Sequence, residues 1–365
     1  MSRPLNPIKI DLLSDTTTRP TPEMLAAMMA APVGDDVFAE DPTVNALEER
    51  VADQFGMESA LFCASGTMTN QIAVNVHTRP GDSLVCHELA HIYLYEGGGL
   101  MANSGVSVRL TGSPDGLMTA AEVEDAVDTS DNVHNAITKL VAVENTSNRG
   151  GGSCFEMNAM HEIAAVARRY DLAYHLDGAR VFNAMIARHQ DAKDYGRVFD
   201  SISVCLSKSL GCPVGSLLLG ERDFIREARR VRKRLGGGWR QAGVLAAAGL
   251  YALDHHVDRL VEDHAKAALL HTVIAPRDWV KSVREPQTNI VLVETHSEAV
   301  AVSVRDQLLE HGIRVQHMGR NRLRMVTHLD VSEADIEVVC ERLFHLQPRL
   351  SADAADQKLE AGVAY

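Results

Sequence analysis

Residues 203–220 read SVCLSKSLGCPVGSLLLG, two apolar runs on either side of a short polar turn. The first run is rich in strand-forming residues and ends in Ser-Lys-Ser, where the lysine is Lys208. The second run follows Gly211 and a proline. Short apolar runs bounded by glycine and proline are typical of buried strands. The stretch therefore predicts two buried strands, the first of which presents a lysine at its end.

Lys208 has two interpretations. An amine at a rigid strand end, backed by apolar chain, can lose its proton and attack a carbonyl to form a Schiff base. The alternative is a solvated lysine in a surface loop, which is the state of most lysines. The residues upstream favour the reactive lysine.

A carboxylate ends another predicted strand upstream of Lys208. Residues 172–177 read LAYHLD and run directly into Gly-Ala-Arg, so Asp177 follows a buried apolar run. A lysine and a carboxylate at neighbouring strand ends are what pyridoxal phosphate (PLP) requires, an amine for its aldehyde and an anion for its ring nitrogen. Asp177 is also a candidate N-cap of the following helix, since Asp is favoured there.

A third feature is a turn suited to phosphate. Residues 59–64 form an apolar run, after which Ser65-Gly66-Thr67 opens a helical pattern. Small residues leave the backbone N–H groups at the start of the helix accessible, and the helix dipole favours an anion there. The phosphate turn, the strand-end Asp177 and the strand-end Lys208 together predict a PLP site.

The whole chain alternates helical and strand-like segments, which predicts an α/β fold with a mostly parallel sheet. The motif residues fall at the carboxyl ends of the predicted strands, where ligands bind in such sheets. The predicted helices span 23–31, 43–55, 158–169, 181–188 and 222–235, and the predicted strands span 59–63, 83–86, 138–143, 172–177 and 200–206.

The rest of the chain predicts a second, smaller domain. A long interrupted helix over 241–275 leads into C-terminal segments that read as a small α/β domain, at 289–294, 297–310, 314–316, 323–328 and 332–346. We therefore expect an N-terminal segment contributing to the site at 1–20, a large PLP-binding domain at 21–250, a small domain at 251–348 and a loose tail at 349–365.

Long sequence motifs resemble a known family. They include LLSDTTTRPTPEMLAAMMAAPVGDDVFAEDPTVNALEE at 12–49, HIYLYEGGG from His91, HLDGARVFNA from His175 and RMVTHLDVS near the C-terminus. Over almost its whole length the chain resembles the low-specificity L-threonine aldolases, fold type I PLP enzymes of the β-eliminating lyase group. The resemblance implies a PLP-dependent transferase-like large domain and a small C-terminal α/β domain. It also implies retro-aldol cleavage of L-threonine or L-allo-threonine to glycine and an aldehyde.

The resemblance implies roles for individual residues. Lys208 would hold PLP covalently, Asp177 would pair with its ring nitrogen, and His91 would stack on the ring and take part in catalysis. The other implied contacts are Gly66 and Thr67 at the phosphate, Arg180 near the cofactor and substrate, and Arg324 with Ser14 at the substrate carboxylate. Lys233 and Arg240 would reach the phosphate of a neighbouring subunit, which implies a homotetramer with shared active sites.

One position departs from the family pattern. Where the family commonly reads Glu-Asn-Thr-His-Asn, residues 144–148 read Glu-Asn-Thr-Ser-Asn, so Ser147 replaces a histidine associated with the substrate hydroxyl. Serine does not titrate near neutral pH, and the general base is then His91, an ordered water or the cofactor phosphate. A related PLP lyase or transaldolase for a different β-hydroxy amino acid is therefore the alternative function.

A zinc-binding pattern competes with this assignment. Residues 87–91 read HELAH, and on a helix the HExxH pattern places two imidazoles on one face for zinc. Here a predicted strand at 83–86 leads directly into the motif, and no third ligand motif follows. We therefore expect no metal, and a zinc metalloprotease using His87 and His91 is a distant alternative.

Composition argues against several other classes. A net charge of −13 disfavours nucleic acid as the main partner, and a solvated helix face explains most of the basic residues at 222–240. No apolar stretch approaches the roughly 20 residues of a membrane span, and the N-terminus lacks the apolar region of a signal peptide. The six cysteines lack paired spacing, which suits a reducing compartment. We expect a cytoplasmic enzyme that acts on a small amino acid.

Overall fold

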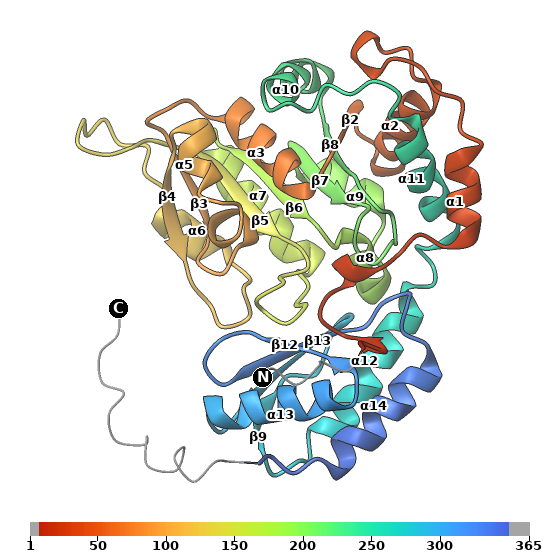
Figure 1. Cartoon of the computed structure of the whole chain (residues 1–365). Coiled ribbons are helices and arrows are strands. Elements are labelled where there is room, and N and C mark those ends of the chain that lie inside the picture. The colour runs from red at the N-terminus through yellow and green to blue at the C-terminus, as the bar shows by residue number, and fades with distance from the viewer. Residues whose placement is uncertain (1–6, 350–365) are drawn as a thin grey trace. The chain divides into compact units, whose positions relative to one another are not determined.

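The computed structural model describes residues 7–349, which divide into two compact units (Figure 1). The large unit is Thr18–Val261. The small unit combines the described parts of Met1–Thr17 and Glu262–Tyr365. The predicted tail lies outside the described residues except for its first residue. Within residues 7–349, no helix has both the length and the apolar character needed to cross a membrane.

A seven-stranded sheet forms the centre of the large unit, in the order β2-β8-β7-β6-β5-β3-β4. Strand β8 runs antiparallel to both of its neighbours, and the other six strands run parallel to one another. The predicted mostly parallel sheet is therefore confirmed. The strands are β2 (Ser59–Cys63), β3 (Ser83–His87), β4 (Ser107–Thr111), β5 (Thr138–Glu144), β6 (Ala173–Gly178), β7 (Ser201–Cys205) and β8 (Ser216–Gly220).

Three helices of the large unit precede its first strand, and the others alternate with or follow its strands along the chain. They are α1 (Pro22–Met29), η2 (Asp36–Phe38), α2 (Pro42–Phe55), α3 (Gly66–His77), α4 (His91–Leu94), α5 (Gly99–Ser104), α6 (Ala120–Ala126), α7 (Met157–Arg169), α8 (Val181–Arg188), α9 (Ala192–Val198), α10 (Arg222–Arg234) and α11 (Gly243–His255).

Helices cover both faces of the sheet because its strands are apolar on both sides. On one face, Leu61 packs with apolar residues of α3 and α10, and Leu84 packs with α3 and α5. Their sequence neighbours Phe62 and Val85 point to the opposite face and belong to a larger core with α2, α7 and α11. This two-sided burial leaves the ends of the strands as the place for polar chemistry.

The small unit contains a four-stranded antiparallel sheet, β12-β13-β10-β9, and a parallel pair, β1-β11. Its core joins Ile10 and Leu12 from the start of the chain to Val291, Leu323 and Ile336 from the other end. Its elements are β1 (Ile10–Asp11), η1 (Asp15–Thr17), β9 (Val280–Val283), β10 (Ile290–Thr295), α13 (Glu298–Glu310), β11 (Ile313–Arg314), β12 (Gln316–His317), β13 (Arg322–Val326), α14 (Glu333–His345) and most of α12 (Leu260–Ile274).

The helices and strands predicted in the large unit all form, and each end lies within two residues of its predicted position. The predicted long helix is divided into α11 and α12, and the predicted segment at 314–316 falls on two separate short strands, β11 and β12. Strand β4 was missed because it is an edge strand with partly exposed residues rather than an apolar run. Its Arg109 pairs with Asp128.

Candidate active site

The predicted site residues of the large unit gather at one edge of its sheet. Strands β5, β6 and β7 are parallel neighbours, and Glu144 lies in register with Asp177, which lies in register with Ser203. Lys208 follows three residues after the last residue of β7. The carboxyl edge of the sheet therefore carries Asp177 and the Lys208 turn on adjacent strands.

The backbone around Lys208 is held from two sides. The carbonyl oxygen of Lys208 accepts hydrogen bonds from Thr18 Oγ1 at 2.9 Å and from Gly211 N at 2.8 Å. Gly211 has a φ of 77°, a conformation that glycine adopts without strain. The Lys208 side chain is half-buried. Two hydrogen bonds thus hold the backbone of a half-buried lysine in place.

Helix α3 begins beside the end of β7. Ser65 is its N-cap, and Ser65 Oγ accepts a hydrogen bond from Met68 N. A Cβ atom added at Gly66 would lie 2.6 Å from Cys205 Sγ, so the first turn of α3 approaches β7 too closely for a larger residue. Thr69 Oγ1 and Ser203 Oγ, 2.6 Å apart, join the same two elements. The start of a twelve-residue helix therefore meets the strand that leads to Lys208.

Asp177 is almost completely buried, with 2% of its surface exposed. Its Oδ1 accepts a hydrogen bond from Ala179 N at 3.1 Å, and its Oδ2 accepts one from Asn70 Nδ2 at 2.9 Å. Helix α8 begins two residues after Ala179 with Arg180 at its N-cap position and no side-chain cap. The helix-capping interpretation of Asp177 is therefore wrong, and its carboxylate is held at the sheet edge instead.

This donor set fits PLP. The start of α3 offers backbone N–H groups and small residues to a phosphate, and Gly66 is required there by the close approach of Cys205. The buried carboxylate of Asp177 suits a protonated ring nitrogen, because a buried charge is stable only when it is paired or hydrogen-bonded. Lys208 offers the amine. The three groups lie on one sheet edge.

His91 is the first residue of α4, whereas His87 ends β3. The HELAH motif therefore does not form one helix, and its two histidines do not share a helical face. Backbone nitrogens instead lie beside both ring nitrogens of His87, with Leu89 N 2.9 Å from Nδ1 and Ser113 N 2.8 Å from Nε2. The geometry that a HExxH zinc protease requires is absent from this segment.

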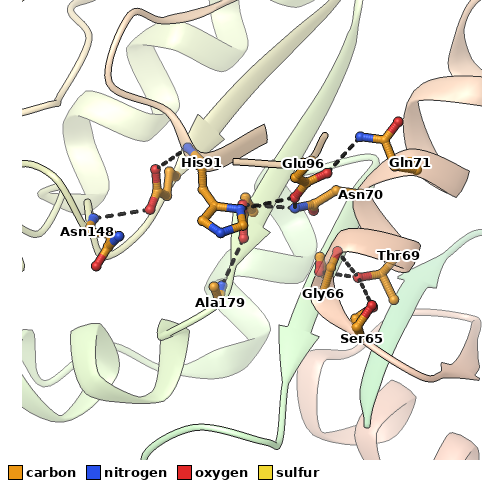
Figure 2. Close-up of polar contacts among 12 residues, drawn as sticks. Ser65, Gly66, Thr69, Asn70, Gln71, His91, Glu96, Asn148 and Ala179 are labelled. Atoms are coloured by element: carbon orange, nitrogen blue, oxygen red, sulfur yellow. Dashed lines mark hydrogen bonds and ion pairs between the residues drawn. The ribbon is translucent and has the colours of Figure 1, made fainter. Parts of the chain in front are cut away.

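His91 contacts a buried acid that sequence reasoning missed. Its Nδ1 lies 3.2 Å from Glu96 Oε1, and the Glu96 side chain is fully buried (Figure 2). Burial alone would lower the pKa of His91, but the hydrogen bond to Glu96 and the charges of Asp177 and Glu144 outweigh it and raise the pKa. The sequence did contain a clue to this contact, because Glu96 is the acid in the HIYLYEGGG motif that begins at His91.

Glu144 joins the His91 segment to the loop after β5. Its Oε2 accepts a hydrogen bond from His91 N at 3.0 Å, and its Oε1 accepts one from Asn148 N at 3.1 Å (Figure 2). Burial, with a further contribution from the negative charge of Asp177, raises the pKa of Glu144 to about 7. Glu144 therefore fixes two backbone segments at the rim of the site.

The loop after β5 also contains Ser147, which is buried. Its Oγ accepts a hydrogen bond from Gly150 N at 3.2 Å. A Cβ atom added at Gly116 would lie only 2.0 Å from that Oγ, so the side chain packs in a tight turn. Arg180 is buried too, and its Nη1 donates to Asn148 Oδ1 at 3.4 Å. Arg180 therefore contacts the same loop.

The predicted carboxylate clamp belongs to the small unit. Arg324 is 6% exposed, and its Nη2 donates to Leu13 O at 3.1 Å and to Gln316 Oε1 at 2.5 Å. Ser14 follows Leu13, and its Oγ accepts from Thr16 N. The small unit thus brings Arg324 next to the Leu13-Ser14 segment, although they lie far apart in the sequence.

Lys233 and Arg240, the predicted contacts to a neighbour's phosphate, are exposed in the large unit. Arg240 Nη1 pairs with Asp35 Oδ2 at 2.7 Å. A Cβ atom added at Gly238 would lie 3.0 Å from Lys233 Nζ, so the lysine folds over the glycine-rich loop.

Comparison with known proteins identifies the family. Residues 11–298 match the family described as β-eliminating lyase. The chain belongs to this family. The low-specificity L-threonine aldolase of Escherichia coli K12 is 41% identical over 331 residues, covering 90% of this chain and 97% of the relative. A probable low-specificity L-threonine aldolase of Arabidopsis thaliana is 39% identical over 92% of this chain and 97% of its own length.

Solved structures confirm the predicted fold type I architecture. A threonine aldolase of Leishmania major has a TM-score of 0.78 at 21% identity and covers 92% of this chain and 98% of its own. A serine palmitoyltransferase of Sphingomonas wittichii has a TM-score of 0.71 at 18% identity over 92% of this chain and 86% of its own. The resemblance found in the sequence is therefore confirmed, and the zinc metalloprotease alternative is wrong.

The Gly66 contact leads to a test of the phosphate turn. We expect Gly66→Ala to weaken PLP binding about tenfold, roughly 1.4 kcal/mol, because the new methyl group displaces either the first turn of α3 or Cys205. The measurement is PLP affinity by equilibrium dialysis. Cys205→Ala should retain normal affinity, and the Gly66→Ala/Cys205→Ala double variant should recover most of the loss. Unchanged affinity of the single variant would contradict this close approach.

Proposed function

We propose that this chain is a PLP-dependent aldolase that cleaves L-threonine, L-allo-threonine and related β-hydroxy-α-amino acids to glycine and an aldehyde. The observation that carries the proposal is the adjacency of Asp177 and the Lys208 turn on neighbouring strand ends, beside the start of α3. The family membership and the activity named for the relatives support the same reaction.

In this proposal the large unit holds the cofactor. Lys208 supplies the amine that attaches it, Gly66 and Thr67 hold its phosphate, and His91 lies against its ring. When bound, PLP supplies an electron-accepting ring that stabilises the negative charge left on Cα. Asp177 keeps a proton on the ring nitrogen, because its buried carboxylate supplies a negative charge that favours the protonated form.

Substrate orientation selects the bond that breaks. We assign the substrate carboxylate to Arg324 with Ser14, and we place Arg180 near the cofactor and substrate. A bidentate arginine fixes a carboxylate in both position and plane. Fixing the carboxylate would determine the rotation about the bond to Cα, and this rotation would select the Cα–Cβ bond for cleavage.

Cleavage requires a base for the β-hydroxyl proton. Ser147 does not titrate near neutral pH, and its Oγ accepts a hydrogen bond within its own turn. His91 is a titratable group at the rim with its side chain 30% exposed, whereas the Glu144 carboxylate is occupied by the backbone N–H groups of His91 and Asn148. We therefore assign the proton to His91, and we place Ser147 near the substrate hydroxyl only as a packing neighbour.

Assembly and location form part of the same proposal. The exposed positions of Lys233 and Arg240 are compatible with contact to the phosphate bound by a neighbouring subunit, as in a homotetramer with shared sites. We propose a cytoplasmic enzyme. A PLP lyase or transaldolase for a different β-hydroxy amino acid is the second candidate, because Ser147 replaces the family histidine at the substrate hydroxyl.

Lys208 should be the residue that attaches the cofactor. Borohydride reduction of the parent protein should leave cofactor bound after denaturation, and L-threonine should release acetaldehyde. Lys208→Ala should lose both properties, while the matched Lys233→Ala should keep the covalent attachment. Covalent cofactor on denatured Lys208→Ala would overturn the assignment. Attachment without aldehyde release from threonine by the parent would favour the second candidate.

Asp177 should matter more for turnover than for cofactor retention. We expect Asp177→Ala to lower kcat by about 10²–10³-fold, because its contact with the ring nitrogen strengthens as charge moves into the ring. Asp177→Glu should recover part of the loss. The measurements are single-turnover cleavage and PLP affinity. Unimpaired turnover of folded, PLP-loaded Asp177→Ala would contradict the role.

His91 and Ser147 should differ in their effects. His91→Ala removes the assigned base and should reduce kcat by about 10²-fold or more. Ser147→Ala removes only a hydroxyl that bonds within its turn, and we expect a loss of less than about threefold, since a single neutral hydrogen bond contributes roughly 1 kcal/mol. Steady-state kinetics of both variants with L-threonine and L-allo-threonine measures the two losses. Equal losses of kcat would contradict the larger role of His91.

A further inference from the structure

A continuous chain of buried hydrogen bonds runs beneath the candidate site, from β7 to the acids at the sheet edge. His175 Nδ1 lies 2.8 Å from Ser201 Oγ, and His175 Nε2 lies 3.1 Å from Asn70 Oδ1. Asn70 Nδ2 lies 2.8 Å from Glu96 Oε1 and 2.9 Å from Asp177 Oδ2 (Figure 2). All five residues are buried.

The direction of these hydrogen bonds follows from the acids. Ionised carboxylates only accept, so both N–H groups of the Asn70 amide point to Glu96 and Asp177. Asn70 Oδ1 must then accept from His175 Nε2. Burial lowers the pKa of His175 to about 3, so its ring is neutral and carries one proton. That proton lies on Nε2, and His175 Nδ1 accepts from the Ser201 hydroxyl.

The same reasoning determines the tautomer of His91. Its Nδ1 faces Glu96 Oε1, the oxygen that also accepts from Asn70. Gln71 Nε2 donates to the other oxygen, Glu96 Oε2, at 2.7 Å, so the carboxylate is held at both ends. Nδ1 of His91 must therefore carry a proton. Within residues 7–349, Nε2 of His91 forms no hydrogen bond, and in the neutral ring it carries the basic lone pair.

We propose that Glu96 and Asn70 are positioning residues for the aldol cleavage. Glu96 holds His91 in the tautomer whose Nε2 accepts the β-hydroxyl proton, and Asn70 ties Glu96 to Asp177. The base and the partner of the cofactor ring nitrogen thus form one hydrogen-bonded unit. The inference rests on the proposed function, because it assigns roles within that reaction.

The proton inventory of this step balances. The β-hydroxyl proton moves to His91 Nε2, the Cβ–O bond becomes a carbonyl, and the electron pair of the Cα–Cβ bond remains on Cα. His91 keeps its proton on Nδ1, and the Glu96 carboxylate beside it stabilises the resulting imidazolium, as a carboxylate does for a histidine base in general. The proton finally added to Cα to form glycine equals the one removed from the hydroxyl, so no other reactant is needed.

The charges that face His91 agree with this assignment. Glu96, Asp177 and Glu144 are the acids, and their combined effect raises the pKa of His91 despite its burial. The nearby arginines are connected to His91 through other residues. The Arg149 guanidinium lies 5.8 Å from the centroid of the Tyr95 ring, which is 5.7 Å from the His91 ring. Arg180 bonds Asn148, whose backbone binds Glu144, and Lys208 lies on the same sheet edge.

The test is Glu96→Gln in the PLP-loaded protein, with Glu88→Gln as the matched control. Glu88 is an exposed acid three residues before His91, and its replacement removes the same charge without touching the network. NMR titration with ¹⁵N-labelled histidine reports the pKa and tautomer of His91, identified among the 16 histidines by its loss in His91→Ala. The pH profile of kcat/KM is recorded in parallel.

For Glu96→Gln we expect a lower His91 pKa, a share of the Nε2–H tautomer and a kcat/KM reduced by about tenfold or more. The acid limb of kcat/KM should move to lower pH, because a base with a lower pKa stays deprotonated further into acid. Glu88→Gln should match the parent in each measurement. Glu96→Asp, which keeps the charge, should retain a raised His91 pKa with a smaller loss of activity.

The outcomes separate this inference from the proposed function. A parent that cleaves no β-hydroxy amino acid would defeat the proposed function, whereas the NMR titration would still show whether Glu96 controls His91. Glu96→Gln with the parent's His91 titration and the parent's pH profile would overturn the positioning role. If Glu96→Gln does not fold, Glu96→Asp with a fully parental His91 tautomer, pKa and kcat/KM would also overturn it.

Discussion

The burial of the Asp177 carboxylate is the constraint on which the rest of the site depends. A charge removed from water is unstable unless hydrogen bonds and opposite charges replace its hydration. Here Ala179 N and the Asn70 amide supply those hydrogen bonds. Asn70 reaches Asp177 only because α3 packs closely on the ends of β6 and β7, and that approach in turn requires a glycine at position 66. The phosphate turn and the carboxylate are therefore set by one packing contact.

Concentrating acids at one sheet edge has a functional consequence. Asp177, Glu96 and Glu144 all lie near His91, and burial together with the charge of Asp177 raises the pKa of Glu144 to about 7. Such a cluster favours cations, and the proposed chemistry has two of them, a protonated ring nitrogen and an imidazolium. Because these charges are in place before the reaction, little reorganisation is needed during it. The folded chain is thus prepared for the charges that develop.

Much of this arrangement was predictable from local sequence. Lys208, Asp177 and the turn at Gly66 each follow an apolar strand, and parallel strands place their carboxyl ends on one edge. The helix and strand pattern of the large unit was also local, because burial on both faces makes its strands continuous apolar runs. The edge strand β4 escaped prediction for the opposite reason, since its partly exposed residues follow no apolar run.

Residue order along the chain was therefore sufficient for the fold type and for placing Lys208, Asp177 and Gly66 beside strand ends, because each has a signature within a few neighbouring positions. The roles of Asn70 and Glu96 emerged only from the folded chain. Asn70 contacts Glu96 across 26 positions and Asp177 across 107, and no local periodicity relates such distant residues. Tertiary structure also decided that Asp177 does not cap α8 and that His87 and His91 do not share a helix. Hydrogen-bond partners of buried polar groups are chosen by packing in three dimensions, which neighbouring residues alone do not specify.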